Sequence, residues 1–151
     1  MKVVAVGVDF SPLSHQALQS ALRLSAPHDA EVVLVHVAAP DPDFVGMEAG
    51  PQSVRDDVAR ELWEERAALH ELAREVESTG RRVQVVMVRG AAATSLVEVA
   101  SDSKADLLVV GSHGRGPVKR FFLGSVSEGV LRHAPCPVLV VPEVSVGEEV
   151  G

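Results

Sequence analysis

The chain of 151 residues is long enough for about one domain with a single sizeable core, and its hydrophobic fraction of 46% is ordinary for a globular protein. Aromatic residues make up 3% of the sequence, with no Tyr and one Trp, so Val, Leu and Ala have to build most of the core. The net charge of −7 argues against broad nucleic-acid binding, which gains its energy from positive charge and counterion release.

Two features bear on where the protein works. Cys136 is the only cysteine, so no internal disulfide can form and a reducing compartment is expected; in the run APCP we interpret it as a small buried hydrophobe. The first apolar run, Val3 to Val8, is too short for a signal-peptide core or a membrane span. We therefore expect a cytoplasmic protein with no membrane partner.

The first third of the chain alternates apolar runs with a helical pattern. Val3 to Val8 is continuously apolar, which is typical of a strand buried on both faces. Ser11 and Pro12 supply an N-cap and a first-turn proline for the helix that comes next. A second strand is predicted at Val32 to Val37. A loop rich in Pro and Gly then extends from Ala38 to Pro51 and is long for a compact domain.

The rest of the chain begins with a long amphipathic helix, predicted from Gln52 to about Thr79. We interpret its mixed Arg and Glu residues as a solvated face with ion pairs one turn apart, and Trp63 as a core or interface residue. Its predicted apolar stripe consists of Val54, Val58, Leu62, Leu69, Leu72 and Val76. The later elements alternate strand and helix, at Val83 to Val88, Ala92 to Ser103, Asp106 to Val110, Gly124 to His133 and Val138 to Val141.

Strands buried on both faces and joined by helices predict a parallel sheet that is covered on two sides. With right-handed crossovers, this is a doubly wound, three-layer α/β/α domain, assigned to residues 1–142, followed by a flexible tail at 143–151. Ligands of such sheets bind beyond the carboxyl ends of the strands, where the strand order reverses. We therefore expect the loops after the first and fourth strands to share one crevice.

The loop after the fourth strand, GSHGRG, is followed nine residues later by Gly124 and Ser125 at a helix start. Gly114 and Gly116 let the backbone approach a ligand, and the free N–H groups of a helix start attract anions. The Ser125 hydroxyl adds a hydrogen-bonding group or a metal contact. Positive charge gathers between the two glycine clusters in an otherwise acidic chain, at Arg115, Lys119 and Arg120. This combination favours a polyphosphate ligand.

Other interpretations of these residues remain open. The loop is not a Walker A motif, because no GKS or GKT ends it, and no GxGxxG opens the domain, so a purely structural turn is the alternative. Asp9 at the end of the first strand serves equally well as a cap for the next helix or as a ligand contact. His113 touches phosphate or lies in solvent, and His36 is interpreted as a satisfied core histidine.

These residues resemble a known family. Gly111-x-x-Gly114, nine residues and then Gly124-Ser125 is similar to the G-2x-G-9x-G(S/T) signature of the universal stress protein family. The runs VVAVGVDFSPLSHQAL, VVLVHV, ADLLVVGSHGRG and APCPVLVVP extend the resemblance over nearly the whole chain. It implies the strand order 3-2-1-4-5 and, in the branch that carries the motif, bound ATP, with Mg or Mn on the phosphates and Ser125.

The resemblance also implies the roles of individual residues. Val8, Asp9 and the backbone of Val37 would border the adenine and ribose, and Gly111 would lie by the ribose. The phosphates would be held by Gly114, Arg115, Gly116, Gly124, Ser125 and Val126. Ser112 and His113 complete the set of candidate ATP-binding residues. Family members commonly dimerise through the last strand, and an apolar edge strand invites such pairing, so a homodimer through Val138 to Val141 is expected.

We find no convincing nucleophile, base and orienting group in the sequence. The favoured hypothesis is therefore an ATP-binding stress-response or regulatory protein, in which nucleotide occupancy alters conformation or the binding of unidentified protein partners. One alternative is a slow ATP hydrolase or a phosphoryl or nucleotidyl transferase of similar fold, with Asp9 orienting a metal or water. The other is a nucleotide-free dimeric scaffold.

Overall fold

The computed structural model describes residues 1–40, 52–113 and 124–143. Part of the long loop after the second strand therefore lies outside the described residues, as do Gly114, Arg115 and Gly116 of the glycine loop and the end of the tail.

Five parallel strands form one sheet with the order β3-β2-β1-β4-β5, which confirms the predicted topology. The strands are β1 (Val3–Gly7), β2 (Glu31–Ala38), β3 (Val83–Arg89), β4 (Leu107–Gly111) and β5 (Val138–Val141). Their order reverses between β1 and β4, which are neighbours in the sheet although two other strands separate them in sequence. The crevice predicted for a ligand therefore lies where these two strands end.

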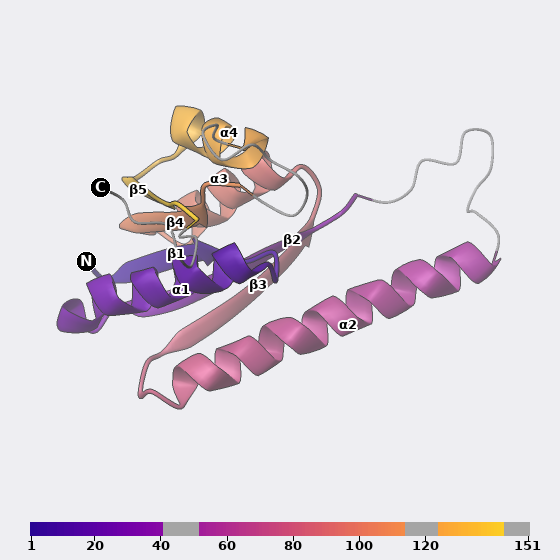
Figure 1. Ribbon diagram of the computed structural model, residues 1–151, viewed down its shortest axis with the longest axis horizontal. Helices are drawn as coiled ribbons and strands as arrows, with labels where there is room; N and C mark the ends of the chain where they lie inside the picture. The colour runs from indigo at the N-terminus through magenta and orange to yellow at the C-terminus, as the bar shows by residue number, and fades with distance from the viewer. Residues whose placement is uncertain (41–51, 114–123, 144–151) are drawn as a thin grey trace.

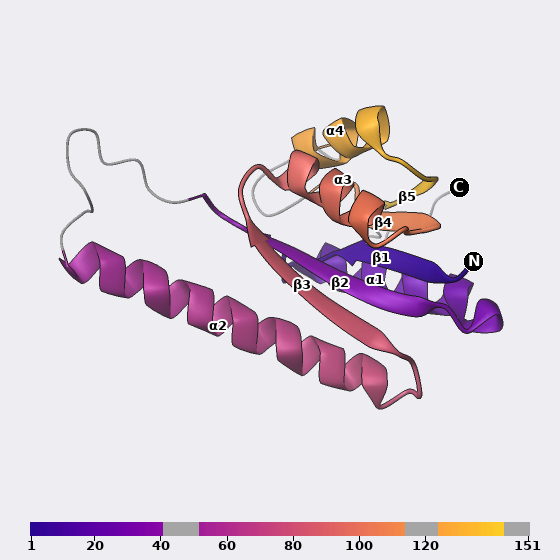
Figure 2. The same cartoon turned by 180° about the vertical axis from the view of Figure 1, so that it is seen from behind.

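Helices cover both faces of this sheet, as Figures 1 and 2 show. The helices are α1 (Pro12–Ser25), α2 (Gln52–Glu77), α3 (Ala92–Asp102) and α4 (Ser125–His133), with a short 3-10 turn at Ala26–His28. The α1 and α2 helices lie on one face, and α3 and α4 pack beside each other on the opposite face. The three-layer α/β/α architecture is confirmed.

The hydrophobic core is divided by the sheet into two clusters, because successive strand residues point to opposite faces. Val4 and Val6 of β1 join the cluster under α1 and α2, while Ala5 joins the one under α3 and α4. All three are fully buried. The small and β-branched residues that the composition supplies thus fill both sides of the sheet without large aromatic side chains.

Local signals place the helix ends close to where the sequence predicts them. Ser11 is the N-cap of α1, where its side chain accepts a hydrogen bond from the Ser14 N–H at 3.2 Å, and Pro12 is the first helical residue. Gly80, just after α2, has φ +88°, a left-handed conformation that glycine adopts without strain. The first of these turns connects β1 to α1, and the second connects α2 to β3.

The long helix α2 differs from its sequence-based description in its burial. Of the predicted apolar stripe only Leu69 and Val76 are buried, together with Ala73, and all three lie in the carboxyl-terminal half of the helix. The side chain of Trp63 is 71% exposed, so Trp63 is not a core residue of this chain, and its other interpretation, as an interface residue, stays a prediction. The amino-terminal half of α2 therefore contributes little to the core.

Candidate functional site

The turn after β1 is fixed by hydrogen bonds within itself. The Asp9 carboxylate accepts the Ser11 N–H at 2.9 Å, and the Ser14 hydroxyl oxygen accepts the Asp9 N–H at 3.4 Å. Ser11, not Asp9, caps α1. The Asp9 carboxylate thus shapes the turn before the helix.

The end of β4 forms the other side of the crevice. A side chain at Gly111 would bring its Cβ to 2.9 Å from Leu13 Cγ, so the glycine is required for the close approach of α1 to β4. Beyond it, the Ser112 N–H donates to the Val141 carbonyl of β5 at 2.9 Å. The Ser112 carbonyl in turn accepts the Gly124 N–H at 2.7 Å and the Ser127 hydroxyl at 2.8 Å. Ser112 therefore joins the strand end to the start of α4.

The start of α4 leaves backbone donors available. Gly124 is the N-cap and has no side chain to satisfy them. Among the described residues, none accepts a hydrogen bond from the N–H of Ser125 or Val126. The first N–H groups of a helix carry partial positive charge and point outward along its axis. The amino terminus of α4 is therefore suited to an anion.

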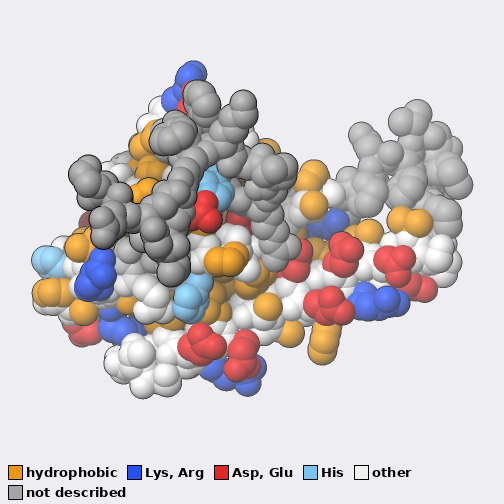
Figure 3. All heavy atoms as spheres, viewed as in Figure 1, with side chains coloured by type: hydrophobic (Ala, Val, Ile, Leu, Met, Phe, Trp, Pro, Cys, Tyr) orange, Lys and Arg blue, Asp and Glu red, His pale blue; other side chains and the backbone are white. Residues whose placement is uncertain are grey.

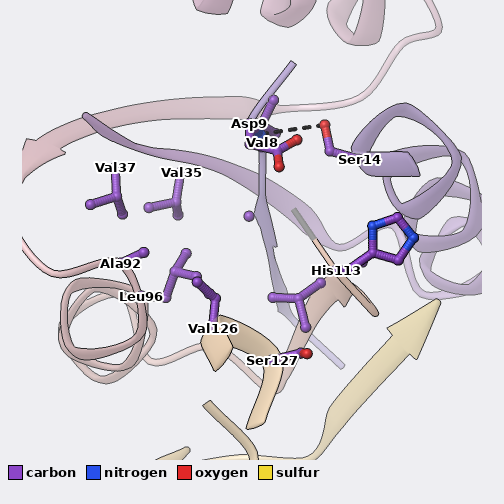
Figure 4. A pocket seen from close by; sticks show the side chains of 13 residues that line it. Val8, Asp9, Ser14, Val35, Val37, Ala92, Leu96, His113, Val126 and Ser127 are labelled. Carbon is purple, nitrogen blue, oxygen red and sulfur yellow. Dashed lines mark hydrogen bonds between the residues drawn. The ribbon is translucent and has the colours of Figure 1, made fainter. Parts of the chain in front are cut away.

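A cleft lies between these two strand ends and the first turns of α3 and α4 (Figure 4). One wall is apolar and is formed by Val35, Val37, Ala92 and Leu96, while Asp9, Ser14, His113 and Ser127 supply polar groups. The remaining lining residues are Gly7, Val8, Val110, Gly111 and Val126. An apolar wall beside a few polar groups is the usual composition of a small-molecule site.

His113 connects this cleft with the segment after β5. Its side chain is 15% exposed, and its Nε2 lies 3.1 Å from a carboxylate oxygen of Glu143. The carboxylate thus places negative charge next to the His113 ring, at the edge of the cleft.

Six of the residues predicted for the site line this cleft: Val8, Asp9, Val37, Gly111, His113 and Val126. Ser112 and Gly124 stand behind it and fix the loop to α4. Ser125 is exposed and is not among the lining residues, and Gly114, Arg115 and Gly116 lie outside the described residues.

Sequence reasoning missed other lining residues, chiefly Ala92 and Leu96 on α3 and Ser127 on α4. Ser127 is 1% exposed, and its hydroxyl also reaches the Gly124 carbonyl at 3.0 Å. The position of Ser127 in the first turn of a helix was the available signal, but a serine there is equally common as a surface residue.

Two titratable groups with shifted pKa values lie outside the cleft. The pKa of Asp106 is lowered because its carboxylate accepts the backbone N–H groups of Lys2 and Val3, at 2.7 and 2.9 Å. Burial raises the pKa of the Cys136 thiol, and the negative charge of Asp106 raises it further.

In the described ranges no group of three His, Cys, Asp or Glu side chains could hold a metal ion. Nor is any of the described helices long and apolar enough to cross a membrane.

The fold is that of a doubly wound α/β protein, and its cleft lies at the strand-order reversal. Residues 1–142 match the family model described as "Universal stress protein family". The chain belongs to the universal stress protein family.

Individual relatives agree with this assignment. Universal stress protein MJ0531 of Methanocaldococcus jannaschii is 36% identical over 141 residues, which cover 93% of this chain and 81% of that protein. The solved structure of protein MJ0577, from the same organism, superposes with a TM-score of 0.77 at 29% identity, covering 96% of this chain and 98% of that one. A universal stress protein solved in complex with cAMP has a TM-score of 0.69 at 28% identity, over 93% and 96% of the two chains.

Proposed function

We propose that this universal stress protein is an ATP-binding regulatory protein whose nucleotide occupancy modulates its conformation or the binding of a partner. The observation that carries the proposal is the continuity of the cleft. It runs from the apolar wall of Val37, Ala92 and Leu96 to Val126, whose N–H has no acceptor among the described residues. An apolar wall fits a flat base, and free helix N–H groups fit a phosphate.

In the proposed orientation of ATP, the base is at the apolar wall and the phosphates are at the start of α4. The base lies against the apolar wall near Val8 and Val37, and the Asp9 carboxylate and Gly111 border the ribose. The phosphates then reach the start of α4, at Gly124, Ser125 and Val126, and the glycine loop with Ser112, His113, Gly114, Arg115 and Gly116. When bound, Mg or Mn would neutralise the phosphates, with the Ser125 hydroxyl as the protein's contribution. The cAMP bound by the related structure supports a cyclic or linear adenine nucleotide in this fold.

A homodimer is part of the proposal. Within the described part of the chain, β5 pairs with β4 alone and is thus an edge strand of the sheet. Its side chains Val138, Leu139 and Val140 are half-buried. Pairing of this edge with the same strand of a second copy would satisfy its free backbone groups.

The proposal is tested by calorimetric titration of the full chain with ATP, at one Mg concentration. Ser125→Ala removes a hydrogen bond to a charged phosphate, worth about 1.5–3 kcal/mol. That loss is equivalent to a roughly tenfold to hundredfold weaker affinity. Ser101→Ala is the matched control, because Ser101 is an exposed serine of α3 that does not line the cleft. Unchanged ATP affinity in Ser125→Ala, or no ATP binding by the parent, would count against the proposal. Release of phosphate in the same samples would favour the hydrolase alternative.

A further inference from the structure

A second concave surface lies on the other side of the turn after β1, between the start of α1 and the middle of α2. It consists of two hollows that share Phe10 and Ala68, and we call their combined surface the acidic groove. Its residues are Val8, Phe10, Ser11, Ser14, His15, Glu61, Glu64, Glu65, Ala68, Glu71, Leu72 and Glu75. None of these described lining residues is Lys or Arg, although α2 contains four arginines.

The helical repeat explains this sorting of charge. Glu61, Glu64, Ala68, Glu71 and Glu75 come one after another at spacings of three, four, three and four residues, so they share one face of α2. This face adjoins the buried stripe that packs on the sheet. The sequence predicted a solvated face of mixed charge on α2, whereas the charged α2 residues that line the groove are all acidic. Figure 3 shows acidic side chains, in red, along α2, with basic side chains, in blue, among them.

Most of this negative charge is not neutralised within the described residues. Glu65 faces His36 Nε2 at 3.1 Å, and Glu71 pairs with Arg74 at 3.1 Å. The carboxylates of Glu61, Glu64 and Glu75 form no hydrogen bond or ion pair with any other part of the chain that the structure describes. A groove lined by charge of one sign concentrates its field and attracts the opposite charge.

The apolar lining residues of the groove, which we call its floor, are Val8, Phe10, Ala68 and Leu72. Val8 is buried, Phe10 and Leu72 are half-buried, and Ala68 is exposed. Phe10 has φ +63°, a conformation that bulky residues rarely adopt and that often marks a functional position. Its ring lies 4.7 Å from the His36 ring, centroid to centroid, and His36 is held by a 2.7 Å hydrogen bond from Nδ1 to the Val8 carbonyl. The Phe10 ring therefore packs against a buried histidine ring that is itself held by a hydrogen bond to the backbone.

We propose that the acidic groove docks a short basic segment of a partner protein, with an apolar side chain on Phe10 and Leu72 and Lys or Arg side chains toward the free glutamates. The apolar floor distinguishes this occupant from a simple cation, and the negative rim excludes nucleic acid. The same groove of a second copy carries the same negative charge, so it would not pair with this one. Docking of the peptide segment does not require bound nucleotide. Val8 and Ser14 line both the groove and the cleft. The groove is therefore our candidate for the surface at which the partner of the proposed function binds.

The probe for this site is a short fluorescein-labelled peptide in which leucine and lysine alternate. Its binding to the full chain is measured by fluorescence anisotropy at low salt and without nucleotide. We expect saturable binding that weakens as salt is added, because surface charges are screened. A leucine–glutamate peptide should not bind, and a serine–lysine peptide should bind more weakly because it leaves the apolar floor uncovered.

Two variants locate the site. Glu64→Gln combined with Glu75→Gln removes two negative charges from the groove and should weaken the peptide about fivefold, given the modest worth of exposed charge pairs. Glu77→Gln combined with Glu98→Gln is the control, because it removes the same charge from exposed residues that do not line the groove, and its affinity should equal the parent's. Ala68→Gln places a longer polar side chain over the apolar lining without changing charge and should also weaken binding.

Three results would overturn the proposal: no binding of the leucine–lysine peptide, equal affinities in the two double variants, or equal affinities for the leucine–lysine and serine–lysine peptides. A change in sedimentation of Glu64→Gln with Glu75→Gln would indicate that a second copy fills the groove, which also contradicts it. Because ATP is absent from every sample, the peptide assay tests docking in the groove alone. Its result is therefore independent of whether the cleft binds ATP.

Discussion

Gly124→Val is the substitution that probes the junction between the glycine loop and α4 most sharply. Gly124 has φ −67° and ψ 161°, an ordinary extended conformation, so the backbone accepts any residue there and the effect is purely steric. A Cβ at this position would lie 3.1 Å from His113 Cα and 3.3 Å from the Ser112 carbonyl oxygen. Because these neighbours are backbone atoms, residues 112–113 and the start of α4 have to move apart to admit the side chain.

The expected cost depends on this geometry. Overpacking of this kind costs about 1–3 kcal/mol, which lowers Tm by roughly 2–10 °C in a domain of this size. Displacement of the loop from the helix start should also remove at least two hydrogen bonds to phosphate. At about 1.5–3 kcal/mol each, their loss weakens ATP more than about a hundredfold. Thermal unfolding monitored by circular dichroism measures the first effect, and calorimetric titration with ATP measures the second.

Gly80→Ala is the control for stability loss away from the site. Nothing lies within 4 Å of a Cβ at Gly80, but its φ of +88° strains any side chain, so the substitution should cost about 1 kcal/mol. It should leave ATP affinity unchanged. If Gly124→Val keeps the parental Tm and ATP affinity, or if Gly80→Ala weakens ATP equally, the steric explanation is wrong.

Two further predictions concern the sheet. The N–H groups of Lys2 and Val3 lower the pKa of the Asp106 carboxyl group in the folded protein. The ionised carboxylate should therefore stabilise the fold at pH values above its unfolded-state pKa of about 3.9. This stabilisation is lost as the pH falls through the lower folded-state pKa. Asp106→Asn should therefore unfold more readily than the parent in urea at pH 7, and the difference should disappear in acid; a constant difference would contradict this. The homodimer should sediment as such at micromolar concentration, and Val140→Pro, which breaks the pairing edge, should yield monomer; an intact Val140→Pro dimer would exclude β5 as the interface.

The strands and their order were predictable because each strand is an apolar run and each connection is helical. The strand ends were predicted less accurately: β2 begins at Glu31 and ends at Ala38, because backbone pairing with β1 and β3 extends past the apolar side chains. Val54, Val58 and Leu62 of the predicted apolar stripe are only half-buried, since periodicity identifies the apolar face of α2 but not where the sheet beneath it ends.

The candidate site was predictable where it lies at strand ends. Val8, Asp9 and Gly111 lie at the carboxyl ends of β1 and β4, and topology alone brings them together. Ala92 and Leu96 were not predictable, because the rotation of α3 against the sheet decides which of its side chains face the cleft. The acidic groove shows the same limit: the spacing of its glutamates is visible in the sequence, but only packing shows which face of α2 borders α1.

The central claim is that ATP binds in the cleft with its phosphates at the start of α4, and amide NMR of the labelled chain during titration with ATP and Mg tests it most directly. We predict saturable shifts of the Asp9, Gly124, Ser125 and Val126 amides, with the Glu77 and Glu98 amides unchanged. Shifts that leave the α4 amides unaffected, or no shifts at millimolar ATP, would contradict it.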